Sequence, residues 1–530
     1  MQVRFLAALA TLVATVLVVA SGSALGAGTT RSAAPNTTQY LVVFKVGHSG
    51  AGVQAVRAAG GRVVRIDKVG VGTVTSSKPA FARALRASGA VAAVARNASF
   101  FQPALKAADP PPEGTHTAAA EASACASLYS VPLTVGPDPL SPCQWDMRII
   151  GASPTGSYDV NQGAGVKVGD LDTGIDLNHP DLAPNLDVAA SCSFIYASTP
   201  TSDPSEQVTP GNCSNKSAVQ DLNGHGTHTA GTMAAAINGL GVAGVAPEAT
   251  IVALKAGTIE GYFFTQSVVD GLVYAGDHRL DVVNMSFFAD PWLFNCRNDV
   301  EQRAIVEAIS RAARYAQQKG VVLVVAAGND GIDLNHPIVD EVSPDYPPDS
   351  AVTRPVNNSC VVMPQEIPGV VNVSATGAAN LLAWYSTYGN VVDVAAPGGS
   401  RFQTPTFDSS RGRVLAPYSA TASDLALEAS LGRLVQDPNN GAYWAWLNGT
   451  SMAAPHAAGV VALIRSQHPG LPVGAVVAIL KEVATKMACP GVLDPGVEFF
   501  GAPVQFCSGG IGGNNFFGAG LVNALSAANR

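Results

Sequence analysis

The sequence predicts an α/β protein whose parallel sheet has helices on both faces, preceded by a small α+β domain. Unbroken Val-rich runs are typical of parallel strands buried on both faces, and longer helical stretches alternate with them. The length of 530 residues also exceeds what one ordinary domain needs. The large domain is expected over 161–530, with strands at 166–171, 251–254, 282–285, 321–326, 370–373 and 391–394, and helices at 226–236, 300–319, 451–467 and 473–485.

Residues 38–102 are predicted to form the small, ferredoxin-like domain. The pattern indicates strand, helix, two strands, helix and strand, in the order 40–45, 52–59, 62–66, 71–75, 79–87 and 91–95. The following segment, 103–160, contains three consecutive prolines and many Ala, Ser and Thr residues. We expect it to be a linker and an exposed arm.

The first 27 residues have the features of a secretory signal peptide. Arg4 precedes an apolar run over residues 5–20, and small residues follow at 21–28. An uncleaved membrane anchor is the alternative. No later segment offers about 20 uninterrupted apolar residues, so the mature chain is expected to be secreted and free of the membrane.

The charge balance excludes some partners. The net charge is -8 and no basic run occurs, whereas nucleic acids and anionic membranes require clustered Lys and Arg. We therefore expect no nucleic-acid partner, and we expect a monomer.

Eight cysteines follow the signal peptide, and none belongs to a Cys-x-x-Cys pair. An even number suits an oxidising compartment and favours disulfides over free buried thiols or zinc. About 105 connectivities are possible. The simplest pairs neighbours: Cys125 with Cys143, Cys192 with Cys213, Cys296 with Cys360, and Cys489 with Cys507.

Asp172 lies in Asp-Thr-Gly, directly after the expected strand 166–171. A carboxylate at a strand end can reach a cleft, although Asp-x-Gly is also ordinary turn chemistry. Aspartic peptidases need two Asp-Thr-Gly copies, and this chain has one.

His225 is flanked by Gly224 and Gly226 at the start of an expected helix. Small neighbours let backbone and substrate approach the imidazole closely. A helix-capping role and a metal pair with His228 are the alternatives, but the His-Glu-x-x-His pattern is missing.

Ser451 lies in Gly-Thr-Ser-Met-Ala-Ala-Pro, where another helix is expected to begin. The positive end of a helix favours a developing oxyanion. Taken alone, a plain N-cap serine would be the more common interpretation.

Together, the three motifs in the order Asp, His, Ser resemble the subtilisin family from about residue 166 to residue 524. α/β-Hydrolases and chymotrypsin-like enzymes have other orders. The resemblance implies a serine endopeptidase that acts on proteins or peptides through an acyl-enzyme, with Ser451 as nucleophile, His225 as base and Asp172 orienting the imidazole. It also implies that Asn329 donates to the oxyanion. We expect activity to fall as His225 is protonated, near its reference pKa of about 6.5.

The resemblance further implies that substrate lies between two backbone segments, Ser286-Phe287-Phe288 and Ala326-Ala327-Gly328. Phe287 and Phe288 replace the usual Leu-Gly. This departure predicts a narrowed or altered preference for the substrate residues around the scissile bond, and it raises the alternative of a dedicated processing peptidase. Asp170 is a second departure, because relatives have an apolar residue there. We expect it to be salt-bridged or hydrogen-bonded to local backbone without a catalytic role; tuning of the site is the alternative.

By the same resemblance, the small domain is an inhibitory propeptide that the enzyme removes itself; a permanent accessory domain is the alternative. No cofactor is required for the chemistry. Asp181 and Asn238 match the family's structural calcium positions, although the ligand from the N-terminal arm does not align. Two other classes of protein are considered: a catalytically silent binding module on the same fold, and an esterase. The absence of Gly-x-Ser-x-Gly around Ser451 argues against the esterase.

Overall fold

The computed structural model describes residues 37–96, 115–407 and 409–530. The predicted signal peptide therefore lies outside the described residues, as does the end of the predicted propeptide. No described helix is both long enough and apolar enough to cross a membrane.

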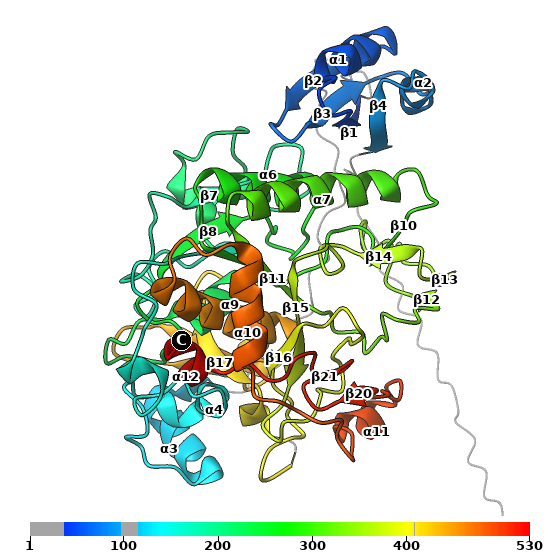
Figure 1. Ribbon diagram of the computed structural model, residues 1–530. Helices are drawn as coiled ribbons and strands as arrows, with labels where there is room; N and C mark the ends of the chain where they lie inside the picture. The colour runs from blue at the N-terminus through cyan, green and yellow to red at the C-terminus, as the bar shows by residue number, and fades with distance from the viewer. Residues whose placement is uncertain (1–36, 97–114, 408) are drawn as a thin grey trace, which may run out of the picture. The chain divides into compact units, whose positions relative to one another are not determined.

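A seven-stranded parallel sheet forms the centre of the large domain (Figure 1). Its strands lie in the order β16-β15-β11-β9-β6-β8-β7. They are β16 (Val394–Pro397), β15 (Val371–Thr376), β11 (Val322–Ala326), β9 (Val282–Met285), β6 (Lys167–Asp172), β8 (Thr250–Lys255) and β7 (Cys192–Ser193). All six strands expected in this domain are present, and the short edge strand β7 is additional. The α/β prediction is confirmed.

Helices cover both faces of this sheet (Figure 1). One face packs on α6 (Thr265–Asp277) and α7 (Gln302–Gln318). The other packs on α5 (His225–Ala234), α9 (Thr450–Gln467) and α10 (Val473–Val483). Sequence reasoning missed α6, in which nearly every residue is buried. Because all strands run parallel, their carboxyl ends meet at one edge, where a site is expected.

The small domain has the predicted order of elements. Its antiparallel sheet runs β2-β3-β1-β4, with two helices on one side. The elements are β1 (Thr38–Phe44), α1 (Ser49–Ala58), β2 (Gly61–Ile66), β3 (Val71–Ser76), α2 (Phe81–Ala87) and β4 (Val91–Arg96). The opposite sheet face packs on the large domain, since side chains of β1, β3 and β4 join the core formed with α6 and α7.

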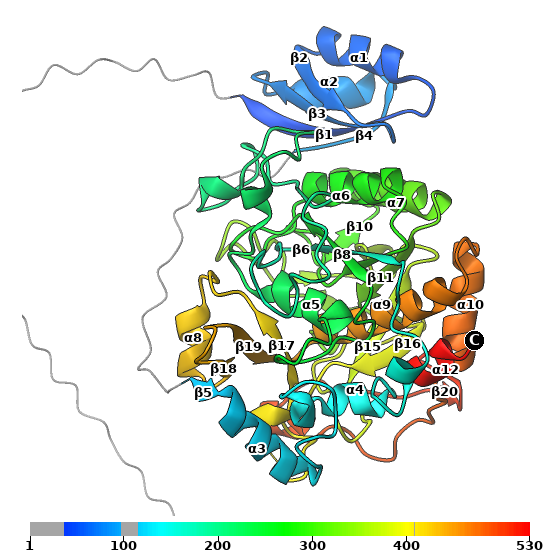
Figure 2. The ribbon, with the colours of Figure 1, turned by 90° about the vertical axis from the view of Figure 1, so that its left-hand side faces the viewer.

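The prediction of an exposed linker and arm over 103–160 is wrong for its described part. Residues 116–149 include β5 (His116–Thr117), α3 (Ala118–Tyr129) and α4 (Trp145–Ile149). Figure 2 shows α3 beside a second sheet, in which β5 pairs with β18 (Leu434–Gln436) and β19 (Tyr443–Leu447) lies between β18 and β17 (Val414–Tyr418). Small Ala and Ser residues let α3 pack closely, so a composition that resembles a linker belongs to a packed helix.

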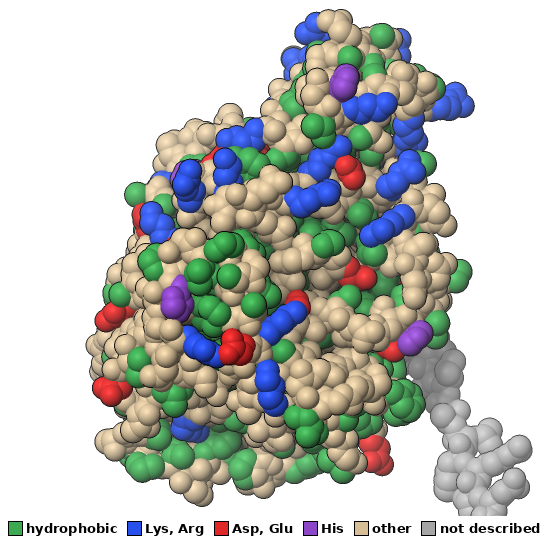
Figure 3. All heavy atoms as spheres, in the orientation of Figure 1, with side chains coloured by type: hydrophobic (Ala, Val, Ile, Leu, Met, Phe, Trp, Pro, Cys, Tyr) green, Lys and Arg blue, Asp and Glu red, His purple; other side chains and the backbone are tan. Residues whose placement is uncertain are grey.

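All four disulfides join the neighbouring cysteines that the simplest pairing predicts. The face drawn in Figure 3 carries mostly neutral and hydrophobic side chains, with charged ones scattered between them. This distribution agrees with a charged content of 13%.

Candidate active site

Asp172 is the last residue of β6, and its side chain is buried. Its Oδ1 accepts a hydrogen bond from the backbone N–H of Thr173 at 2.7 Å and one from His225 Nδ1 at 2.7 Å. Gly174, at φ +106°, turns the chain away directly after the strand. The strand end therefore delivers the carboxylate to the imidazole.

His225 is the first residue of α5. Gly224 before it adopts φ +104°, and a Cβ there would lie 2.3 Å from the ring of Tyr418. Only glycine fits this position. Because Nδ1 carries the proton that Asp172 accepts, Nε2 is left as the proton acceptor.

The surroundings of His225 change its pKa. Burial alone would lower the pKa, but the charge and hydrogen bond of Asp172, together with the charges of Asp170 and Asp221, outweigh burial and raise it to about 9. The expected titration near 6.5 is thereby moved upward.

Ser451 lies in the first turn of α9. Its hydroxyl donates to the carbonyl of Ser286 at 3.1 Å, and the Ser286 hydroxyl donates to the carbonyl of Ser451 at 2.9 Å. Among the described hydrogen bonds, none joins Ser451 to His225, yet both side chains line one cavity. Such bonds often form only with substrate bound.

Asn329 follows β11 and lines the same cavity. Its Oδ1 accepts from the backbone N–H of Thr450 at 2.8 Å and from the Thr450 hydroxyl at 2.9 Å. The hydroxyl oxygen accepts in turn from the N–H of Gly328 at 3.0 Å. With Oδ1 engaged, Nδ2 is the donor available to a ligand. Sequence reasoning missed Thr450, although it stands next to Ser451 in the motif.

The cavity has a volume of about 330 Å³. Five of the six predicted substrate-contact residues line it: Ser286, Phe287, Phe288, Ala326 and Gly328. Ala327 does not, because it is buried and its N–H donates to Val373 on β15. The ring of Phe287 stacks on that of Phe263, with 4.1 Å between centroids.

The expectation that Asp170 is held by local backbone or a salt bridge is wrong, because its partners are side chains of α5 and β9. Its buried carboxyl group accepts from Thr229 Oγ1 at 2.9 Å and from Asn284 Nδ2 at 3.0 Å. Burial, and then the charge of Asp172, raises its pKa well above the usual range.

The alternative of a metal pair between His225 and His228 does not fit the structure. His225 is bonded to Asp172, while His228 Nε2 lies within 3.2 Å of the backbone carbonyls of Val414 and Ala445. Burial lowers the pKa of His228 to about 3, so its ring is a neutral donor inside the core.

The predicted calcium ligands Asp181 and Asn238 lie close together. Asp181 Oδ2 accepts from Val242 N–H and from Trp444 Nε1, while the buried Oδ1 has no hydrogen-bond partner. The arm brings Asp138 beside them, where its Oδ1 accepts from the N–H of Gly239 and its buried Oδ2 is also unpartnered. Burial raises the pKa of Asp181 to about 7. Two unpartnered carboxylate oxygens suit a hard cation; sequence reasoning missed Asp138 because the arm carries no alignable pattern.

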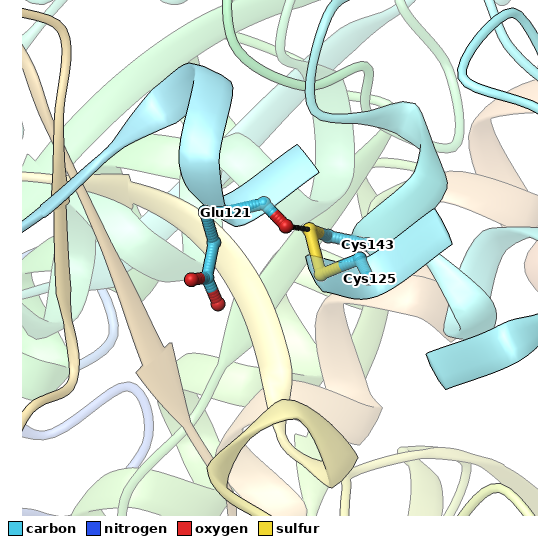
Figure 4. A group of neighbouring side chains, drawn as sticks. All are labelled: Glu121, Cys125 and Cys143. Carbon is cyan, nitrogen blue, oxygen red and sulfur yellow. Dashed lines mark hydrogen bonds between the residues drawn. A yellow bond between two sulfur atoms is a disulfide. The ribbon is translucent and has the colours of Figure 1, made fainter. Parts of the chain in front are cut away.

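A second group of potential ligands is not a metal site. Glu121, Cys125 and Cys143 lie together in Figure 4, but the two cysteines form a disulfide. Glu121 is already satisfied by Arg411, at 2.8 Å from both carboxylate oxygens, and by Trp446 Nε1.

Comparison with known proteins gives the family. The model of the subtilase family matches residues 163–501. M-protease from Shouchella clausii is 30% identical over 69% of this chain, and the match spans 64% of its own length. Subtilisin BL from Lederbergia lenta is 29% identical over 69% of this chain and 91% of its own length. The chain belongs to the subtilase family, whose members are serine endopeptidases.

Solved structures share the fold. The epidermin leader peptide processing serine protease EpiP from Staphylococcus aureus has a TM-score of 0.62 at 21% identity, covering 93% of this chain and 98% of that one. Fervidolysin from Fervidobacterium pennivorans, described as a keratinolytic enzyme related to subtilisin, has a TM-score of 0.57 at 22% identity, covering 95% of this chain and 62% of that one.

Proposed function

We propose that this chain is a secreted serine endopeptidase in which Asp172, His225 and Ser451 hydrolyse peptide bonds through an acyl-enzyme. One observation carries the proposal: the 2.7 Å Asp172–His225 hydrogen bond lies beside the cavity that Ser451 and Asn329 also line. No described feature favours a catalytically silent binding module on the same fold.

In this proposal, the Ser451 hydroxyl turns from the Ser286 carbonyl toward His225 Nε2 when substrate binds. Its oxygen attacks the peptide carbonyl while Nε2 takes the proton, and the same proton then passes to the leaving amine. Asp172 stabilises the positive imidazole. Asn329 Nδ2 and the N–H of Ser451 bind the oxyanion. Water repeats the attack on the ester, which releases the acid and restores the hydroxyl.

We also propose that the small domain is a propeptide removed by Ser451. Its contacts with the large domain support tight packing: Arg311 donates to the carbonyl of Phe44 at 2.6 Å, and Thr73 donates to Gln266 at 3.1 Å. Arg65 pairs with the buried Asp270. The carboxyl end of the predicted propeptide, residues 97–102, lies outside the described residues.

The catalytic roles can be tested by labelling. The purified protein is treated with a fluorophosphonate, the adduct is located by mass spectrometry, and the mature N-terminus is sequenced for wild type and Ser451→Ala. We expect labelling at Ser451 and an unprocessed mutant. Ser466→Ala, at the other end of α9, serves as the control and should label and mature normally. An adduct elsewhere, or normal maturation of Ser451→Ala, would refute the proposal.

A dedicated processing peptidase of narrow specificity is the second candidate. Two observations favour it: the Phe287 and Phe288 side chains in the cavity, and the fold shared with a leader peptide processing protease. Cleavage of a broad peptide mixture separates the candidates, because a processing enzyme cuts only a small set of sequences.

Finally, we propose a structural Ca²⁺ ion held by Asp181 and Asn238, with Asp138 as the arm's contribution. The ion would neutralise two buried carboxylates and fasten the arm to the loop at 238–241; it would take no part in peptide hydrolysis.

A further inference from the structure

The cavity beside Ser451 is acidic. Asp290, Asp330 and Asp345 line it together with Ser451 and His225. Within the described part of the chain, no Arg, Lys or His forms an ion pair with any of these three carboxyl groups. A cavity that bound only apolar side chains would not need them.

Two buried acceptor oxygens of the cavity lack a donor. Gln365 is 3% exposed, and its Nε2 donates to the carbonyls of Phe287 and Ala326 at 2.8 and 3.0 Å. These two bonds fix the amide, and its buried Oε1 has no hydrogen-bond partner. Asp345 Oδ1 is buried and unpartnered as well. Gln365 Oε1 and Asp345 Oδ1 therefore both lack a hydrogen-bond donor, and a positively charged donor would suit them best.

Asp290 and Asp345 come from segments far apart in the sequence but lie side by side. Asp290 Oδ2 accepts from the N–H of Phe263, and the N–H of Asp345 donates to the carbonyl of Pro291 at 3.2 Å. Burial, and then a hydrogen bond between the two carboxyl groups, raises the pKa of Asp290 well above its usual range. A bound cation would favour the ionised form of both groups.

The walls suit a long side chain with an apolar stem. Tyr262, Phe263, Phe287 and Phe288 line the cavity, and Phe263 and Phe287 stack on each other. Aromatic faces attract guanidinium and ammonium groups, and they also cover the methylene stems of Arg and Lys.

We propose that this cavity binds an Arg or Lys side chain of the peptide substrate, within a few residues of the scissile bond. This inference rests on the proposed endopeptidase function and specifies its substrate class. An apolar side chain would cover the acceptors of Asp345 and Gln365 without pairing them. Sites that hydrogen-bond a substrate discriminate strongly against analogues that lack the donor, so we expect a preference of about 100-fold or more.

The test compares fluorogenic peptides that differ only at one position, scanned across the four residues on each side of the scissile bond. Arg, Lys, Phe and citrulline are placed there in turn, because citrulline has nearly the shape of Arg without its charge. At one of these positions kcat/KM for Arg should exceed that for citrulline by about 100-fold. A best rate with Phe, or equal rates for Arg and citrulline at every position, would overturn the proposal.

Variants identify the carboxyl groups responsible. Asp345→Asn and Asp290→Asn should each lower the Arg-to-citrulline ratio at least about 10-fold. Glu248→Gln, which removes an exposed charge outside the cavity, should leave the ratio unchanged. Unchanged ratios in both Asp variants would refute the assignment. If a variant fails to fold, competitive inhibition of wild type by benzamidine, a cationic aromatic probe, supplies the second readout, and its absence counts against the proposal.

If the proposed endopeptidase function itself were wrong, the same experiments would give a different result. In that case no peptide is cleaved and the fluorophosphonate does not label Ser451. Labelling combined with a preference for apolar peptides would leave the endopeptidase in place and eliminate only the cationic subsite.

Discussion

Thr450 should control turnover although it takes no part in bond making. Its hydroxyl donates to Asn329 Oδ1 at 2.9 Å and accepts from the N–H of Gly328 at 3.0 Å. It therefore connects Asn329, the proposed oxyanion donor, to one wall of the cavity. Thr450→Val keeps the shape of the side chain and removes both bonds, whereas Thr450→Ser keeps both.

The expected decrease in kcat follows from the hydrogen bonds that Asn329 keeps in Thr450→Val. The backbone N–H of Thr450 still holds Asn329 Oδ1 at 2.8 Å, so one of the two anchors survives in Thr450→Val. A lost hydrogen bond costs about 0.5–1.5 kcal/mol, which corresponds to a decrease in kcat of about 2- to 10-fold. Asn329→Leu removes the donor itself and should lower kcat about 100- to 1000-fold, a range taken from subtilisin rather than from this structure.

Steady-state kinetics on one peptide substrate provide the assay. Both losses should fall on kcat while KM stays near the wild-type value, because the oxyanion exists only after attack. Thr450→Ser should retain wild-type kcat, and melting temperatures check that each variant is folded. A Thr450→Val enzyme with full kcat would show that the Thr450 hydroxyl does not position Asn329. An Asn329→Leu loss below about 10-fold would show that this amide does not serve the oxyanion.

Three further predictions concern pH, calcium and stability. His225 must be neutral to accept a proton, and Asp172 raises the pKa of His225 to about 9. The value of kcat/KM should therefore rise as the pH increases through about 9. A pH profile that already reaches its plateau at neutral pH would contradict this. Removing calcium with EGTA should lower the melting temperature by about 2–5 °C, since Asp181 would lose its counter-charge; an unchanged value would exclude the ion. Arg411→Ala leaves the buried Glu121 without its counter-charge and should cost about 3 kcal/mol in urea unfolding. The double variant Arg411→Met with Glu121→Leu should recover only part of that loss, because Trp446 Nε1 then loses its acceptor.

The sequence was most informative for helices and strands whose residue pattern is regular along their whole length. Val-rich runs located the six central strands of the large domain within a few residues, because buried parallel strands tolerate little else. The βαββαβ order of the small domain was also predicted correctly, from the alternation of short strand patterns with helical ones. The helix α6 was missed, since Gly271 within it weakens the helical pattern. In the fold this glycine lets the helix approach the sheet, where a Cβ would lie 2.2 Å from Leu171.

The site could be predicted as residue types but not as contacts. Three motifs pointed to Asp172, His225 and Ser451; in the structure His225 and Ser451 line one cavity, and Asp172 accepts a hydrogen bond from His225 at 2.7 Å. The 2.8 Å bond from Thr450 to Asn329 joins residues 121 positions apart. No local periodicity encodes such a contact, because both residues end up there through the packing of α9 against the sheet.

The acidic character of the cavity could not be predicted from sequence patterns at all. Asp290 follows β9 closely, but Asp345 belongs to an irregular segment between β11 and β15 with no alternation of apolar residues. The Cys296–Cys360 disulfide and the bond from Asp345 to Pro291 bring the two segments together. One of these two carboxyl groups hydrogen-bonds the other, and their proximity disfavours ionisation of both. The family likeness supports the reaction proposed at Ser451, whereas the proposed preference for a cationic substrate side chain depends on this pair of carboxyl groups, one of which a loop contributes.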